Sequence, residues 1–302
     1  MNNFLIIAGT EKAGTTSLYQ YLNDSGLFTA SSKKETNYLR NPQGEVSIQG
    51  YIENFELSSG NNFYLESSPG YLADSNIVVR NIRKLGLQNS NYIFLLRSPL
   101  SRLKSSFLFH KSRLYIPKNL GFNEYIEKCM RYESGVTPKD LGLEEWFLRV
   151  PDAGLYYKHL VDFIDADIKN LTLIPFEYLS SEPRNCVNLV LDSIGAKTEF
   201  FSHYDFNTSN ITSGFRFTVL QSLALYFNKN LEGFFYKYPS VKRFFLAIYR
   251  SINGAPKENI HLSKDLKILL KNYYYEDIVS LERNQLVPKE IIRAWLNEFE
   301  ND

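Results

Sequence analysis

One stretch of sequence, FLIIAGTEKAGTTSL at residues 4–18, decides the fold of this 302-residue chain. An apolar run is followed by a glycine-bounded turn with one lysine, Lys12, and then by a hydroxyl-rich segment that predicts a helix from Thr15. A buried parallel strand, a loop and a helix N-terminus direct backbone N–H groups toward one place, at the positive end of the helix dipole. Such a site suits a phosphate or a sulfate.

The spacing of Gly9 and Gly14 resembles the triphosphate-binding loop, in which a lysine and a serine or threonine follow the second glycine. Here Thr15 stands at the position of that lysine, and the lysine comes earlier, at Lys12. Because a triphosphate loop needs its lysine at the β- and γ-phosphates, the displaced charge favours a ligand with one 5′-phosphate and a group that leaves from it. A glycine-rich turn without a ligand is the alternative interpretation.

A second motif follows a second apolar run, at residues 91–96, which predicts another buried strand. Arg97 ends this strand, Ser98 is a suitable N-cap, and Pro99 is a suitable first residue for a helix over 99–110. The carboxyl ends of parallel strands meet at one edge of a sheet, where open α/β folds bind ligands. We therefore expect Arg97 to lie beside the first loop.

Together the two motifs resemble those of sulfotransferases that use 3′-phosphoadenosine 5′-phosphosulfate (PAPS). The first loop is similar to their 5′-phosphosulfate loop. The pattern of Arg97, Pro99, Arg102 and Ser105 is similar to their 3′-phosphate module, in which the first arginine and the serine grip the 3′-phosphate. By position, the resemblance gives those roles to Arg97 and Ser105. Taken alone, Arg97 could form a strand-end salt bridge and Ser105 could be a helix-surface hydroxyl.

Further segments resemble glycan-type sulfotransferases, the heparan sulfate enzymes and their bacterial relatives, so that the resemblance spans about residues 4–290. These segments are Lys33–Leu39, Tyr64–Leu72, Gly154–Leu160, Pro175–Leu179 and Leu270–Ile278.

The chain also departs from that pattern. Asn37 stands where many glycan enzymes have histidine, and Ser67 replaces a lysine that lies near their acceptor. These differences argue against a polyanionic glycan acceptor and leave the donor site unaffected. The glycine-rich loop that covers the 3′-phosphate is reduced to the segment from Asn253 to Lys257, in which Lys257 is a weak counterpart of the family's arginine.

The resemblance also implies roles for single residues. Lys12 bridges the 5′-phosphate and the transferring sulfonyl group, and Glu35 matches the glutamate that deprotonates the acceptor. The alternative for Glu35 is a surface ion pair with Lys33 or Lys34. The expected catalytic set is Lys12, Glu35 and Ser105. The expected donor-binding residues are Lys12, Ala13, Gly14, Thr15, Thr16, Ser17, Arg97, Ser105 and Lys257.

On the acceptor side the candidates are Lys34, Glu66 and His110. We expect Glu66 to orient Lys34 or to close the turn before Pro69, and it could contact the acceptor. His110, at the end of the helix that bears Ser105, is the alternative base. We expect His159 to be a packed residue rather than a base.

Composition limits the other possibilities. Apolar residues make up 44% of the chain, which is enough for a large core. The net charge of +1 provides no overall field for nucleic acid or heparin-like chains, so any anion site must be local. Cys129 and Cys186 have no metal-ligand spacing and are expected to be buried thiols in a reducing compartment.

Alternation of strands and helices predicts a single α/β domain over residues 1–302, with a P-loop-like central parallel sheet flanked by helices. Residues 112–152 are expected to be irregular and to form a rim over the acceptor. The predicted elements are strand 4–8, helix 15–24, loop 29–40, strand 62–66, helix 75–85, strand 91–96, helix 99–110, helix 153–164, strand 171–175, helix 183–194, a helical portion over 213–250 and helix 263–282.

Aromatic residues are concentrated within 215–249, interleaved with lysine and arginine. Packing of helices against the sheet is the favoured interpretation, because aromatic stripes usually belong to a core. The alternatives are a patch that docks on a membrane or a lipid-linked acceptor, a wall of the acceptor pocket, and a dimer face.

The sequence thus predicts a PAPS-dependent sulfotransferase that releases adenosine 3′,5′-bisphosphate and needs no metal. Its acceptor is a hydroxyl or amine on a saccharide or a small molecule, and no nucleic acid is involved. No targeting segment or membrane span is evident, which favours a cytoplasmic, bacterial-type enzyme. A small-molecule kinase with an unusual loop and a non-catalytic nucleotide-binding protein are the rivals. The oligomeric state stays open.

Overall fold

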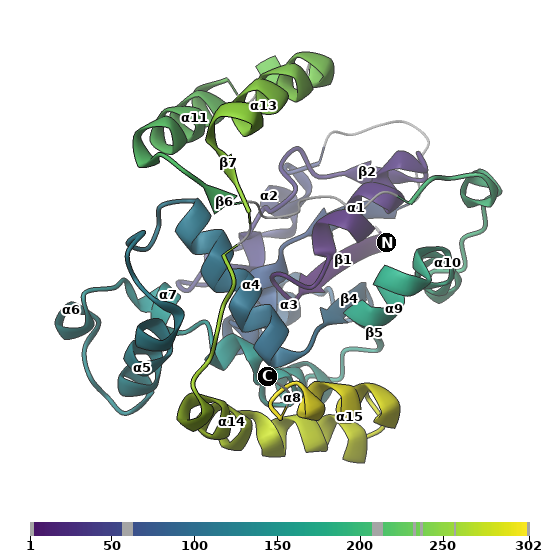
Figure 1. Cartoon of the computed structure of the whole chain (residues 1–302). Coiled ribbons are helices and arrows are strands. Elements are labelled where there is room, and N and C mark those ends of the chain that lie inside the picture. The colour runs from purple at the N-terminus through teal and green to yellow at the C-terminus, as the bar shows by residue number, and fades with distance from the viewer. Residues whose placement is uncertain are drawn as a thin grey trace. The chain divides into compact units, whose positions relative to one another are not determined.

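The computed structural model describes residues 3–55, 63–206, 214–231, 234–235, 238–256 and 258–300. Within these ranges the chain forms two compact units (Figure 1). The first unit consists of Met1–Leu103, Arg149–Asn210 and Lys264–Asp302, and the second of Lys104–Leu148 and Ile211–Ser263. The expectation of a single domain stays a prediction.

A parallel sheet forms the centre of the first unit. In the described part of the chain it has five strands in the order β2-β3-β1-β4-β5, and every neighbouring pair is parallel. The predicted α/β fold is therefore confirmed. The strands are β1 (Asn3–Gly9), β2 (Phe28–Ala30), β3 (Phe63–Ser67), β4 (Asn91–Leu96) and β5 (Asn170–Pro175).

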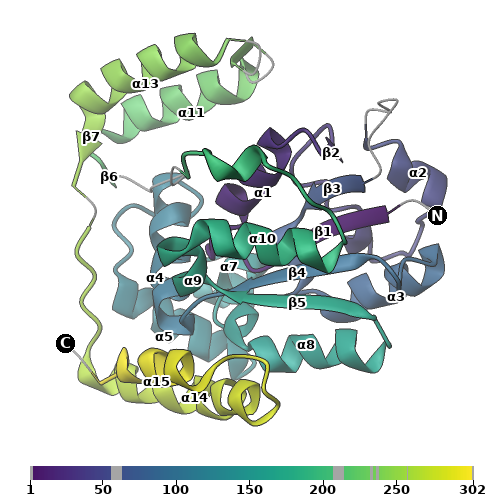
Figure 2. The ribbon, with the colours of Figure 1, turned by 90° about the vertical axis from the view of Figure 1, so that its right-hand side faces the viewer.

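Helices cover both faces of this sheet, which is why its strands are apolar on both sides. Figure 2 shows α10 and α8 on opposite sides of β4 and β5. On one face Leu5 and Ile93 pack in a cluster with residues of α1 and α10. On the other face the ring of Phe94 lies 4.9 Å from that of Phe163 on α8. The helices of this unit are α1 (Thr15–Asp24), α2 (Ile48–Ile52), α3 (Ser75–Leu85), α8 (Tyr156–Asp165), α9 (Phe176–Ser181), α10 (Pro183–Ser193), α14 (Lys264–Arg283) and α15 (Lys289–Asn297), with 3₁₀ turns at Tyr38–Arg40, Pro69–Tyr71, Asp152–Gly154 and Phe200–Ser202.

Helix α4 (Pro99–Ser112) begins in the first unit and continues into the second. Its start is as predicted, because the Ser98 hydroxyl accepts a hydrogen bond from the Ser101 N–H at 3.4 Å. Arg102 is buried and donates from Nη2 to the carbonyl of Val150.

The second unit corrects the expectation that residues 112–152 are irregular. The segment contains α5 (Phe122–Glu133), α6 (Pro138–Leu141) and α7 (Glu145–Leu148). The buried stripe on α5, from Phe122 through Tyr125 and Ile126 to Cys129, has helical spacing. Pro138 is the first residue of α6 rather than a helix breaker.

The aromatic-rich segment forms a helical hairpin in the same unit, with α11 (Thr218–Asn230) and α13 (Pro239–Asn253) side by side in Figures 1 and 2. A short antiparallel pair, β6 (Gly214–Phe215) and β7 (Gly254–Ala255), closes its base. Many of its large apolar side chains are exposed, so the favoured expectation of core packing is wrong for them.

Each unit contains one of the chain's two cysteines, and both are buried as expected. Burial raises the pKa of the Cys129 thiol to about 12 and that of the Cys186 thiol to about 11. Neither thiol is therefore poised to react.

Candidate functional site

The loop after β1 is shaped by Gly14. This residue has a φ of 88°, and a Cβ added there would lie 2.9 Å from Leu179 and 3.2 Å from Phe176. Only glycine fits both the left-handed backbone and the close approach of α9. Lys12, in the same loop, also has a left-handed backbone, with a φ of 68°.

Helix α1 starts directly after this turn. Gly14 has no side chain with which to cap the helix, and its carbonyl accepts from the Ser17 N–H at 3.0 Å. The first N–H groups of a helix have no partner within it and carry the positive end of the dipole. The helix starts at Thr15, as the sequence predicted, and the anion site expected at this start stays a prediction.

Arg97 lies beside this loop. It follows β4, the neighbour of β1, and its Nη1 donates to the carbonyl oxygen of Lys12 at 3.1 Å. Its guanidinium carbon also lies 4.6 Å from the centre of the Phe176 ring. Burial lowers the pKa of Arg97, while Tyr156, Glu298 and Glu177 act in the opposite direction. The predicted meeting of the two motifs at one edge of the sheet is confirmed.

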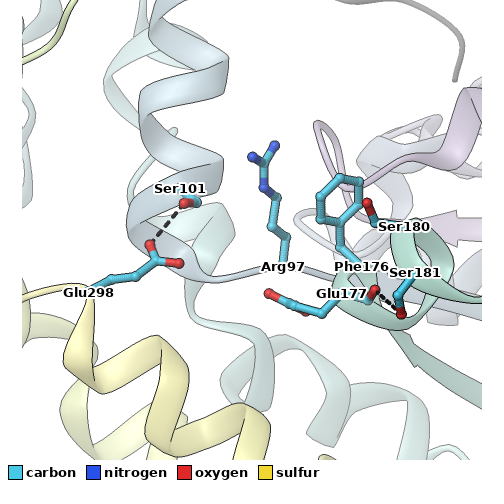
Figure 3. A pocket seen from close by; sticks show the side chains of 7 residues that line it. All are labelled: Arg97, Ser101, Phe176, Glu177, Ser180, Ser181 and Glu298. Atoms are coloured by element: carbon cyan, nitrogen blue, oxygen red, sulfur yellow. Dashed lines mark hydrogen bonds between the residues drawn. The ribbon is translucent and has the colours of Figure 1, made fainter.

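A hollow of about 340 Å³ opens next to Arg97, lined by Arg97, Ser101, Phe176, Glu177, Ser180, Ser181 and Glu298. In Figure 3, Arg97 extends past the side of the Phe176 ring and away from Glu177 and Glu298. The two glutamates add negative charge near the guanidinium.

The C-terminal helix holds this hollow in place. Glu298 accepts hydrogen bonds from the hydroxyls of Ser98 and Ser101, at 2.6 and 2.8 Å. The indole of Trp295 donates to Glu177 at 2.8 Å. No role for Glu177 or Glu298 could be predicted from the sequence, because each bond joins residues more than 100 positions apart and has no local signal.

The loop that carries Glu35 is fixed at the end of β3, the other neighbour of β1. The Ser67 N–H donates to the carbonyl of Lys34 at 3.2 Å. The carboxylate of Glu35 is 53% exposed and lies 3.1 Å from Nζ of Lys34. Glu35 is thus at the same edge of the sheet as the two cationic loops, in the ion pair that the sequence offered as an alternative.

Glu66 is fully buried and surrounded by hydroxyl groups. Among the described residues, four hydroxyls donate to its carboxylate: those of Thr36, Tyr51, Ser68 and Tyr71, the last two at 2.7 and 2.6 Å. Burial, reinforced by the charge of Glu66, raises the pKa of Tyr51 and Tyr71 well above the usual value. Through Ser68 the carboxylate closes the turn, as expected, and through Thr36 it holds the loop that carries Glu35.

Other predicted residues lie in the second unit. Ser105 is half-buried on α4, two turns beyond Arg97 along the chain. His110 is fully buried, with its ring packed edge-on against Trp146 and Phe147. Lys257 lies outside the described residues.

Within the described residues no group of three or more histidine, cysteine, aspartate or glutamate side chains is arranged to hold a metal ion. His159, expected to be packed, is buried beside Asp152 in the first unit.

No protein-family model matches the chain. In sequence it is similar to the membrane-associated sulfotransferase kil1 of Dictyostelium discoideum, with 36% identity over 110 residues. The match covers 35% of this chain and 22% of kil1, so the chain spans about a fifth of that relative.

In structure the chain is similar to a sulfotransferase from Alicyclobacillus acidocaldarius, with a TM-score of 0.62 over 97% of this chain and 99% of the other. The chain has the fold of a sulfotransferase. At 19% identity this likeness establishes the fold. The sequence match to kil1 is to a protein of the family that the sequence motifs resemble. A sulfotransferase domain from the curacin biosynthetic pathway is a more distant neighbour, with a TM-score of 0.40 over 70% of this chain and 81% of that domain.

Proposed function

We propose that the chain is a PAPS-dependent sulfotransferase, which transfers a sulfonyl group to a hydroxyl or amine of a saccharide or small molecule. The observation that carries this proposal is the 3.1 Å hydrogen bond from Arg97 to the carbonyl of Lys12. PAPS has phosphate groups at both the 3′ and 5′ positions of its adenosine. A site for it therefore needs anion-binding groups on two adjoining loops, and the bond brings two such loops together.

The residues present fit this donor. The cradle at Gly14 and the start of α1 suit the 5′-phosphate, and the ammonium group of Lys12 neutralises the charge that develops as the sulfonyl group leaves. Arg97 and Ser105 are assigned to the 3′-phosphate. Like phosphoryl transfer, this reaction depends mainly on alignment and on neutralising the leaving oxygen.

On the acceptor side we assign the general base to Glu35. Its carboxylate takes the proton of the attacking hydroxyl or amine, and this requires it to exchange its ion pair with Lys34 for a contact with the acceptor. Exposed ion pairs of this kind are worth about 1 kcal/mol or less, so the exchange is inexpensive. We assign no catalytic step to His110, because its ring is buried.

We propose that the enzyme acts without a metal, in a bacterial cytoplasm, on a saccharide or small-molecule acceptor. Fractionation of the native host tests the location.

Nucleotide binding is the first test. Adenosine 3′,5′-bisphosphate at about 100 times its dissociation constant should stabilise the protein by roughly 2.7 kcal/mol, measured as a rise in the melting temperature. Arg97→Gln should reduce this rise strongly, and Lys12→Ala should reduce it less. Lys169→Ala is the matched control, since Lys169 is an exposed lysine next to the start of β5, at the far end of that strand from the site.

A larger shift with ATP and magnesium would instead indicate a kinase. The second test is transfer of labelled sulfonate from PAPS to components of a cell extract, identified by mass. Nucleotide binding without any transfer would leave a non-catalytic nucleotide-binding protein. The absence of both would overturn the proposal.

A further inference from the structure

The helical hairpin of α11 and α13 carries large apolar side chains on its outside. On α13, Phe244, Ile248 and Ile252 follow one another at intervals of four residues and so share one face of the helix. Their exposed fractions are 63%, 42% and 54%. A stripe of this length on the surface of a folded protein marks an interaction site.

Helix α11 carries a matching stripe. Val219, Leu223 and Tyr226 lie four and three residues apart, and their exposed fractions are 72%, 47% and 63%. We call the three residues on each helix the apolar stripes of the hairpin. The spacing places each set on one side of its helix.

Hydrogen bonds between polar side chains join the helices near their base. Tyr249 of α13 donates from its hydroxyl to the side chain of Gln221 on α11, and Asn253 donates to the same hydroxyl at 3.0 Å. Asn253 also accepts from the Phe217 N–H at 2.7 Å. These bonds hold the two helices together while the apolar stripes stay exposed, unlike a hairpin whose large apolar side chains are packed within the protein.

The charge of the hairpin indicates what kind of partner it binds. In sequence, α11 and α13 together contain four lysine or arginine residues and no aspartate or glutamate, although the whole chain has a net charge of only +1. Arg250 of α13 is among the exposed residues. Arg250 is two residues from both Ile248 and Ile252, so helical spacing places it on the other side of α13 from the apolar stripe, as on the polar face of a helix that lies in a membrane surface. The partner should therefore have an apolar interior and a negatively charged surface.

We propose that the apolar stripes of α11 and α13 dock on a bilayer that contains anionic phospholipids. Exposed aromatic and aliphatic side chains combined with lysine and arginine are typical of helices that lie in the headgroup region of a membrane. The helices have 13 and 15 residues, and no helix in the described part of the chain could span a bilayer. The hairpin therefore lies on the membrane rather than across it. This inference does not depend on the proposed activity.

Vesicle flotation tests the proposal. The full chain is mixed with vesicles of phosphatidylcholine alone or of phosphatidylcholine with phosphatidylglycerol, and the bound fraction is measured at low and high salt. We expect binding to the anionic vesicles, and weaker binding in high salt because the electrostatic part is screened. The triple variant F244S/I248S/I252S should bind about tenfold less or weaker still.

The matched control is the triple variant I268S/L269S/Y275S, which removes exposed apolar side chains of α14 in the first unit. It should bind vesicles like the wild type. Circular dichroism and melting show that each variant is folded. The proposal would be overturned if the wild-type protein did not bind anionic vesicles. It would also be overturned if the stripe variant and the control variant bound them equally. So would a concentration-dependent dimer in light scattering that the stripe variant alone abolishes, without vesicle binding.

Discussion

Nη1 of Arg97 donates to the carbonyl oxygen of Lys12 across 3.1 Å, although 85 residues separate the two in sequence. The bond joins the loops that follow β1 and β4, which are neighbours in the sheet. Each loop therefore sets the position of the other. A change at either residue should be felt at both ends of the nucleotide, but to different degrees.

Lys12→Ala should lower kcat about 100-fold or more and change donor affinity less, because the ammonium group acts chiefly on charge that develops during transfer. Arg97→Gln should mainly weaken the donor, by about 10- to 100-fold in dissociation constant, the effect of losing a charged hydrogen bond of 1.5–3 kcal/mol. Steady-state kinetics and calorimetry with adenosine 3′,5′-bisphosphate separate the two effects. Equal losses in both variants would refute this division of roles.

Glu35→Gln should lower kcat by about 100-fold or more, because the amide cannot take the proton of the acceptor's hydroxyl or amine. Binding of the product nucleotide should stay unchanged. Glu45→Gln makes the same change at an exposed glutamate outside the proposed site and serves as the control. If Glu35 were only a surface charge, both variants would show the same minor effect. A fully active Glu35→Gln would move the base elsewhere.

Glu66→Ala should destabilise the protein by at least about 3 kcal/mol, because it leaves buried hydroxyls of Tyr51 and Tyr71 without their acceptor. Urea unfolding at neutral pH measures the loss. Glu53→Ala, at an exposed carboxylate near the end of α2, is the control and should change stability by less than about 0.5 kcal/mol. Equal effects at the two glutamates would mean that the hydroxyl cluster contributes little.

Asp152 should make stability depend on acid pH. Burial by itself raises the pKa of Asp152, but hydrogen bonds from His159 and Lys158 lower it to about 2. A carboxylate with a lowered folded pKa stabilises the protein above its unfolded pKa of 3.8 and loses that contribution as the pH falls toward 2. The contribution at neutral pH is roughly 2 kcal/mol. In Asp152→Asn, unfolding free energies measured from pH 2 to 6 should lack this slope. Asp167→Asn, at an exposed aspartate, should retain it.

The sequence predicted the parts of the site that local patterns encode. The strand at 91–96 and the helices at 15–24 and 75–85 have the predicted bounds, since apolar runs, caps and glycine turns act within a few residues. The edge of the sheet where Lys12 and Arg97 meet followed from the rule for parallel strands.

Other features depend on contacts that no local pattern reveals. Glu298 reaches Ser98 across 200 residues, and the partners of Glu66 come from three separate segments. Helix α15 was missed although Ile291, Ile292 and Trp295 have helical spacing after Pro288. The buried residues of α5 have helical spacing, but the prolines on either side of this helix favoured the prediction of an irregular segment. The burial of the aromatic hairpin could not be predicted, because an aromatic stripe has the same sequence pattern whether it packs inside a protein or faces outward.

The two buried cysteines can serve as probes of local unfolding in this protein. Each compact unit contains one thiol, and neither can react with an alkylating reagent until its surroundings open. The rates at which Cys129 and Cys186 are alkylated would therefore report the opening of each unit separately. If a bound nucleotide slowed the alkylation of Cys186 alone, the nucleotide would stabilise only the unit that contains the sheet.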